Sequence, residues 1–217
     1  IIISSNSNEE ELNQYLENKN RSIITFHQQI NNVGISKNYT KLIEICECQY
    51  LHIVSDEDYI DGENLKTFYS FLEESDELSL IILSVTDIDG NIYKDATWQT
   101  NKYLKDSLGE TAHIGSTVIN TKCWNNNSFK IMREYCDREK GDVYPTTAAA
   151  LISYSSAAKL KYLPEHLVQM GAIHDFSEIG GHKTYGTLPK LEQFISILVL
   201  LRSLIIPRKI YVYLYIF

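Results

Sequence analysis

Basic residues and cysteines are both scarce in this chain. Lys and Arg number 20 against 28 Asp and Glu, which leaves a formal net charge of −8. No basic stripe offsets this charge, so sequence-independent binding of nucleic acid is disfavoured. The four cysteines are Cys46, Cys48, Cys123 and Cys136, and no CxxC pair occurs among them. A disulfide framework and a zinc site are therefore weakly supported, and a reducing cytoplasm is favoured.

The chain also lacks a signal peptide, because its first residues contain neither a basic segment nor a cleavage site. It opens without Met on an apolar run, which is typical of a chain that begins in mid-domain. The C-terminal runs 191–206 and 210–217 fall short of the roughly 20 apolar residues that span a bilayer. They predict a helix and a strand packed on the core. Peripheral contact with the inner membrane face through Arg202, Arg208 and Lys209 is the alternative.

What is present suits a folded α/β protein. The 217 residues are 44% hydrophobic and 22% charged, enough for one core or for a nucleotide-binding half with a smaller appended half. Apolar runs at 1–4, 22–26 and 50–54 read as strands, and helical patterns separate them. This alternation predicts a mainly parallel, wound sheet with helices on its faces.

Further elements are expected in the second half of the chain. The predicted organisation is a first unit at 1–95, a second at 96–190 and an apolar C-terminal segment at 191–217. The expected helices are 36–48, 64–72, 98–108, 122–136 and 146–160, and the expected later strands are 78–86, 91–93 and 111–120, with a turn at Asp89-Gly90.

The stretch Tyr50–Asp61, YLHIVSDEDYID, combines an apolar strand with three consecutive acids. An EF-hand calcium loop is excluded, because counting from Asp56 places Ile60 at position 5 and Gly62 at position 7. What remains is a D-x-D directly after a buried strand. Two such carboxylates, Asp56 and Asp58, can bind Mg²⁺ or Mn²⁺ and leave coordination sites for diphosphate oxygens. A solvated turn is the alternative.

The run Asn31–Asp61, NNVGISKNYTKLIEICECQYLHIVSDEDYID, resembles the core of the family-2, GT-A-type glycosyltransferases. Those enzymes carry N-x-G-x-(S/A)-x-N, a helix, an apolar strand and an acidic D-x-D. Here the matching positions are Asn32, Gly34, Ser36, Asn38, Gln49-Tyr50 and Ser55-Asp56-Glu57-Asp58. The start, IIISSNSNEEEL, is similar to the family's second strand. The resemblance implies a GT-A-like (Rossmann-like), mostly parallel sheet flanked by helices, with a smaller acceptor-side half.

The resemblance also implies roles for individual residues. Asp58 is the expected direct metal ligand, and Asp56 is expected to lie near ribose or metal. Glu57 is assigned to the donor site, with a solvent-facing position as the alternative. The full set implied for the nucleotide-sugar is Ser5, Asn6, Asn32, Gly34, Asn38, Ser55, Asp56 and Glu57.

On the acceptor side, the resemblance implies a close-packed turn at Gly115-Ser116 and a general base. Asp142 is the first choice for that base, and Asp137 and Glu134 follow. Solvated charges at helix ends are the alternative for all three. Of the six histidines, His174 and His182 flank Gly180-Gly181 and are considered as metal or acceptor contacts, with an ordinary loop position the more favoured interpretation.

Two departures from the family pattern stand out. Ser5 replaces the acid at the end of the family's second strand, and the family's first strand does not precede Ile1. Because that strand lies within the sheet, either a further segment precedes the chain or another run fills the place, for which Ile210–Phe217 is the candidate.

The resulting hypothesis is a metal-assisted, inverting glycosyltransferase. It would move a sugar from a nucleotide-diphospho-sugar to a glycan or lipid-linked acceptor, in the setting of cell-envelope polysaccharide or O-antigen assembly on the cytoplasmic membrane face. The alternatives are a nucleotidyltransferase of similar fold and a degenerate domain that binds glycans without turnover.

Overall fold

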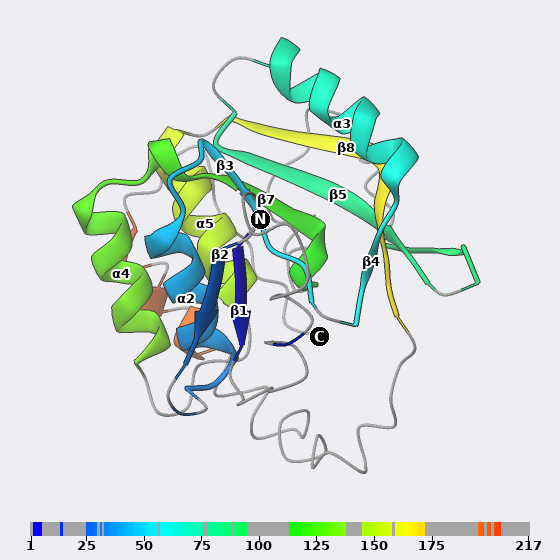
Figure 1. Cartoon of the computed structure of the whole chain (residues 1–217). Helices are drawn as coiled ribbons and strands as arrows, with labels where there is room; N and C mark the ends of the chain where they lie inside the picture. The colour runs from blue at the N-terminus through cyan, green and yellow to red at the C-terminus, as the bar shows by residue number, and fades with distance from the viewer. Residues whose placement is uncertain are drawn as a thin grey trace.

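The structure is a computed structural model of the chain (Figure 1). It describes residues 2–5, 14, 25–29, 31, 33–55, 57–75, 78–87, 89–94, 113–137, 145–157, 159–171, 195–197, 199–200 and 202–204. The expected helix 98–108 and the expected strand Ile210–Phe217 lie outside these residues. That the C-terminal run fills the place of the family's first strand therefore stays a prediction.

A six-stranded mixed sheet forms the larger part of the architecture, in the order β3-β7-β5-β8-β4 with β6 beside β5. Its strands are β3 (Tyr50–His52), β4 (Tyr59–Ile60), β5 (Leu80–Thr86), β6 (Ile92–Lys94), β7 (Thr117–Asn120) and β8 (Leu160–Gln169). Only β5 and β8 run parallel, and the other pairs are antiparallel. The prediction of a mostly parallel sheet was therefore wrong. Hydrophobic periodicity identifies a strand but does not determine its direction.

Strand β5 is the centre of this sheet and is buried along its whole length. Because side chains alternate across a strand, its two faces enter different clusters. Leu80 and Ile82 pack in one cluster with residues of α2, α4 and α5. Ile81, Leu83 and Val85 pack in the other, with Phe68 of α3. The apolar run predicted as a strand is thus a central strand covered on both faces.

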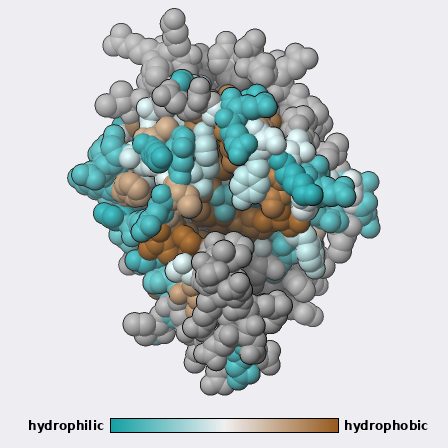
Figure 2. Space-filling view, turned by 45° about the horizontal axis from the view of Figure 1, so that its top comes forward, coloured by the Kyte–Doolittle hydropathy of each residue, from teal (hydrophilic) through white to brown (hydrophobic). Residues whose placement is uncertain are grey.

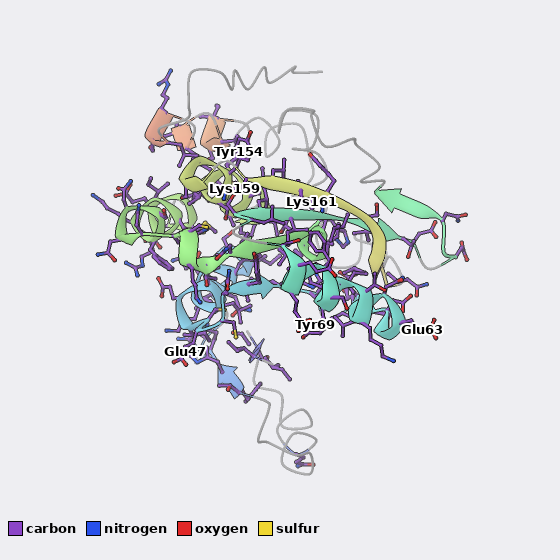
Figure 3. All side chains as sticks on the ribbon, turned by 90° about the horizontal axis from the view of Figure 1, so that it is seen from above. Glu47, Glu63, Tyr69, Tyr154, Lys159 and Lys161 are labelled. Carbon is purple, nitrogen blue, oxygen red and sulfur yellow. The ribbon has the colours of Figure 1, made fainter. Side chains whose placement is uncertain are left out.

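Helices cover both faces of the sheet. α2 (Ile35–Ile45), α4 (Asn126–Cys136) and α5 (Pro145–Ala157) pack together on one face, and α3 (Gly62–Glu74) lies along β8 on the other. Figure 3 shows α3, with Glu63 and Tyr69 labelled, on the opposite side of the sheet from α5 with Tyr154. Lys161 of β8 places its Nζ 4.5 Å from the centre of the Phe71 ring on α3. The α3 face is therefore joined to β8 by a cation–π contact as well as by apolar packing.

A second, two-stranded sheet consists of β1 (Ile2–Ser5) and β2 (Thr25–Gln28), which pair in parallel. Helix α2 follows β2 and packs on β1. The expected parallel pairing is confirmed for these two strands, whereas the third expected strand, at 50–54, pairs antiparallel with β7. In the described residues these two strands form a sheet of their own rather than extending the six-stranded one.

Strand β8 was not anticipated, because a helix was predicted through residue 160 and Pro164 lies inside the strand. Its pairing with β5 passes from Leu83↔Leu163 to Ser84↔His166, so the register shifts at the proline. Such an irregularity accommodates a residue that cannot donate to the ladder. A proline inside the run therefore concealed one of the longest strands.

The hairpin between β5 and β6 has the predicted turn at Asp89-Gly90. Gly90 has φ of 80°, a conformation that favours glycine. The Asp87 carboxylate accepts hydrogen bonds from the backbone N–H of Asp89 at 3.0 Å and of Asn91 at 2.8 Å. Hydrogen bonding, above all from the Asn91 side chain, lowers the pKa of Asp87. Local side-chain chemistry thus sets this turn.

The described part of the C-terminal segment contributes to the core. Ile197, Leu200 and Leu204 are buried with the α4–α5 cluster, whereas Ile195 and Val199 are exposed. The backbone at 195–197, 199–200 and 202–203 is helical. Among the described helices, none combines the length and apolarity that crossing a bilayer requires. The predicted packing of this helix on the core is confirmed for these residues.

The molecular surface mixes hydrophilic and apolar areas. Figure 2 shows an apolar band across the middle of the face that it presents, with hydrophilic residues around it. Among the described residues, large exposed apolar side chains include Tyr59 and Ile60 of β4 and Tyr69 of α3. Both residues of β4 are exposed, as expected at the end of the strand order.

Replacement of Asp61 tests how α3 begins. Its carboxylate accepts from the backbone N–H of Glu63 at 2.8 Å and of Asn64 at 3.2 Å, so it is the N-cap. We expect Asp61→Ala to lower the free energy of unfolding by about 1 kcal/mol. Asp61→Asn retains a capping oxygen and should lose much less. Urea unfolding followed by circular dichroism measures both; equal losses would contradict the capping role.

Candidate functional site

The acidic turn directly follows β3 and the buried Ile53. The backbone N–H of Asp58 donates to the Ser55 carbonyl at 3.2 Å, which closes a tight turn. Glu57 is exposed, while only 8% of the Asp58 side chain is exposed. The turn therefore directs one acid to solvent and the other into the protein. Asp56 lies outside the described residues.

Gly171, just beyond β8, holds Asp58 from one side. Its backbone N–H donates to Asp58 Oδ1 at 3.3 Å. A Cβ at Gly171 would lie 1.7 Å from the Glu57 carbonyl oxygen, so no other residue fits without displacing the turn. The glycine is thus required by close backbone approach. It connects the end of β8 to the acidic turn.

His113, just before the 3-10 helix η4 (Ile114–Ser116), faces the same carboxylate from another side. Its Nε2 lies 3.8 Å from Asp58 Oδ2, and 15% of its side chain is exposed. Its Nδ1 accepts a hydrogen bond from the Gly115 N–H at 3.1 Å. Since that nitrogen is an acceptor, the neutral ring carries its proton on Nε2. The N–H is therefore directed toward Asp58.

The carbonyl of Gly115 is held by a second histidine, His52 of β3. His52 Nε2 donates to the Gly115 carbonyl at 2.9 Å, because a carbonyl can only accept. Burial lowers the pKa of His52, and this hydrogen bond opposes the shift. Gly115 also packs closely on Val168, whose Cγ1 would lie 2.8 Å from an added Cβ. Gly115 is thus a close-packed turn, as expected.

Asn38 links α2 to the first strands. Its Oδ1 accepts from the Ser4 hydroxyl and, at 3.4 Å, from Gln29 Nε2, while its Nδ2 donates to the Ser4 carbonyl at 3.4 Å. Gly34 caps α2 with φ of 81°, a conformation that favours glycine, and its carbonyl accepts from the Asn38 N–H at 3.1 Å. These residues hold the helix start against β1. Ser5, at the end of β1, is buried and its carbonyl accepts from the Gln29 N–H at 3.0 Å.

The structure unites some of the predicted site residues at the acidic turn. Ser55 and Asp58 belong to the turn. Gly115 is connected to it through His113, whose Nδ1 accepts from Gly115 and whose Nε2 faces Asp58. Ser116 donates its hydroxyl to the His113 carbonyl at 2.8 Å, which steadies that loop. The predicted residues outside the described part are Asn6, Asn32, Asp56, Asp142, His174 and His182.

Sequence reasoning missed His52, His113 and Gly171. The available signals were a histidine within the strand that leads to the acids and another two residues before Gly115. Nothing in the sequence places Gly171 against residue 57. Of the secondary candidates for the base, Asp137 is 69% exposed and pairs with Lys37 at 3.7 Å, and Glu134 is 56% exposed and pairs with Lys130 at 3.7 Å. Both are solvated charges on α4, consistent with the simpler interpretation.

A cavity of about 350 Å³ lies elsewhere, between α2 and α4. Its charged lining includes Lys37, Glu44, Arg133 and Asp137, which already form ion pairs with one another. None of the described residues of the acidic turn contributes to its lining. The cavity therefore adds nothing to the candidate site.

The residues present fit a divalent cation that substrate oxygens help to hold. Asp58 uses one oxygen for Gly171 and keeps free lone pairs on both oxygens. Among the described residues, no group of three or more His, Cys, Asp or Glu side chains is gathered as a closed metal site. Mg²⁺ commonly binds through one or two carboxylates together with substrate phosphates. The donor set suits such an open site and not a structural one.

Comparison with solved structures identifies the fold. The structure of S. aureus TarS 1-349 in complex with UDP superimposes with a TM-score of 0.65 at 13% identity, covering 96% of this chain and 57% of that one. A second structure of TarS 1-349 gives 0.58 at 14% identity, with coverages of 92% and 59%. The longer TarS structure also gives 0.58 at 14%, with coverages of 93% and 37%.

The chain therefore has a mixed α/β glycosyltransferase fold. At such identities the likeness concerns the fold alone, and the chain spans less than two thirds of each TarS chain. No family model matches the sequence. No curated protein matches it either.

His52 makes stability depend on pH. Because its pKa is lowered in the folded state, the unfolded chain binds this proton first as the pH falls. Its contribution is complete above the unfolded pKa of about 6.5 and decreases below it. We expect the wild type to lose more stability than His52→Gln between pH 7 and 5, by at most about 1.4 kcal/mol per pH unit. Glutamine retains an N–H that can donate to the Gly115 carbonyl. Urea unfolding at both pH values measures the free energy of unfolding, and an equal loss in wild type and His52→Gln would contradict the prediction.

Gly171→Ala tests the close approach of β8 to the turn. We expect a loss of about 1 to 3 kcal/mol in the free energy of unfolding, because the added methyl group overlaps the Glu57 carbonyl. Gly62→Ala is the matched control, since an added Cβ there has no atom within 4 Å. It should be neutral or stabilising by up to about 1 kcal/mol. If urea unfolding shows equal effects, Gly171 is not constrained as described.

Proposed function

We propose that this chain acts as a glycosyltransferase that transfers a sugar from a nucleotide-diphospho-sugar. One observation carries the proposal: the buried Asp58 carboxylate, held by Gly171 and faced by His113, follows an apolar strand in a glycosyltransferase fold. The TarS structure with UDP supports a uridine diphosphate donor as the first to test. The family-2 pattern at Asn32, Gly34 and Asn38 supports the same assignment.

On the donor side, Asp58 and Asp56 would hold Mn²⁺ or Mg²⁺. When bound, that ion supplies a positive charge that stabilises the departing diphosphate. Ser5 and Asn6 would lie by the base, and Ser55 would lie by the sugar nucleotide. Gly34 permits the backbone before α2 to approach a ligand closely.

On the acceptor side, Asp142 would accept the proton of the attacking hydroxyl. Direct displacement at the anomeric carbon then forms the new glycosidic bond, expels the nucleoside diphosphate and inverts the configuration. The Gly115-Ser116 turn would border the acceptor. The proposed acceptor is a glycan or lipid-linked sugar in cell-envelope polysaccharide assembly, at the cytoplasmic face of the membrane.

Titration calorimetry with UDP-, GDP- and dTDP-sugars, with and without Mn²⁺, tests the function. We expect one donor class to bind in a metal-dependent manner. Asp58→Ala should reduce sugar transfer at least about 100-fold, because a ligand worth several kcal/mol is lost. Glu73→Ala, which removes an exposed carboxylate on α3, is the control and should behave as wild type.

Two results would contradict the proposal. Metal-independent binding of every nucleotide tested would exclude the role of the acidic turn. Near-normal turnover by Asp58→Ala, with the fold intact by circular dichroism, would exclude Asp58 as a metal ligand.

A further inference from the structure

We propose that His113 is a positioning residue that sets the orientation of the Asp58 carboxylate. The proposal rests on the function proposed above and extends it to a residue that does not belong to the acidic turn. His113 does not itself touch the donor. It acts through Asp58.

The Asp58 carboxylate has two polar neighbours on different elements. Gly171 donates to Oδ1 at 3.3 Å, and His113 Nε2 faces Oδ2 at 3.8 Å. Because each carboxylate oxygen faces one of these groups, rotation of the carboxylate about the Cβ–Cγ bond is restricted. One neighbour alone would hold one oxygen and restrict this rotation less. The distance to His113 exceeds a hydrogen bond, and such contacts commonly tighten when the ligand binds.

The hydrogen bond to Nδ1 determines which ring nitrogen of His113 carries the proton. Nδ1 accepts the Gly115 N–H at 3.1 Å, so the neutral ring presents Nε2–H to Asp58. With this tautomer Nε2 has no lone pair to offer a cation. The ring is therefore a donor to the carboxylate rather than a metal ligand in its own right. Residues that contact a metal ligand without touching the metal orient that ligand and tune its basicity in this way.

The residue that fixes His113, Gly115, is itself fixed. The Gly115 carbonyl accepts from His52 at 2.9 Å, and its Cα packs against Val168. β3 therefore contributes twice, since it leads into the acidic turn and also holds the loop that orients Asp58. A rigid second contact of this kind keeps a functional carboxylate in one geometry.

Two substitutions of His113 separate its contact with Gly115 from its contact with Asp58. In His113→Asn, the Oδ1 atom can occupy the Nδ1 position and accept from Gly115, but nothing reaches Asp58. In His113→Gln, the Nε2 atom can occupy the place of the ring Nε2 and donate to Asp58, but the acceptor for Gly115 is lost. The asparagine variant thus removes positioning and keeps the loop contact.

The first measurement is the affinity of the full chain for Mn²⁺ in the presence of UDP, from the electron paramagnetic resonance signal of free Mn²⁺. We expect His113→Asn to weaken Mn²⁺ binding by about 10- to 100-fold, with its thermal unfolding close to wild type. His113→Gln should recover most of that affinity. Wild-type affinity in His113→Asn would overturn the proposal, and so would an equal loss in both variants.

The second measurement does not depend on metal or nucleotide. The exchange of the Gly171 amide proton reports its bond to Asp58. We expect faster exchange in His113→Asn than in wild type and His113→Gln, because a less restricted carboxylate holds that proton less well. Unchanged exchange would overturn positioning. If wild type binds no Mn²⁺ with UDP, GDP or dTDP while the exchange pattern holds, the proposed function fails and the positioning of Asp58 stands.

Discussion

The burial of β5 on both faces is the constraint on which the rest of the structure depends. Its side chains enter two separate clusters, one under α4 and α5 and one under α3. Such a strand must have partners on both edges, because no water reaches its backbone. β7 and β8 supply them. The Gly115 loop directly precedes β7 and Gly171 follows β8. Both therefore lie beside the turn that follows β3.

The candidate site is assembled by backbone contacts as much as by side chains. Gly171 approaches the Glu57 carbonyl too closely for any side chain, and Gly115 is held through both its backbone N–H and its carbonyl. Histidines therefore serve here as fixed donors and acceptors, and the buried acid receives its contacts from outside its own turn. The same packing that stabilises the sheet also holds the residues that contact Asp58, namely Gly171 and His113.

Much of the local structure could be predicted from the sequence. The strand at β3, the helix after Gly34, the strand at β5 and the Asp89-Gly90 turn were all expected, because apolar spacing and turn chemistry act over a few residues. The mostly parallel sheet was wrong, and β8 was missed because Pro164 interrupts it. At the site, Asp58 and Gly115 were predicted individually. Their connection through His113 was not.

The sequence by itself determined most of the helices and strands around the site, though not β8, and it determined that an acidic turn follows β3. Those properties come from neighbouring residues. The tertiary structure alone decided the direction of the strands and the partners of Asp58. Gly171 lies 113 positions beyond it in the chain, and such distant contacts depend on how the sheet pairs and packs. A buried carboxylate needs donors, but which residues provide them is decided only when the strands come together.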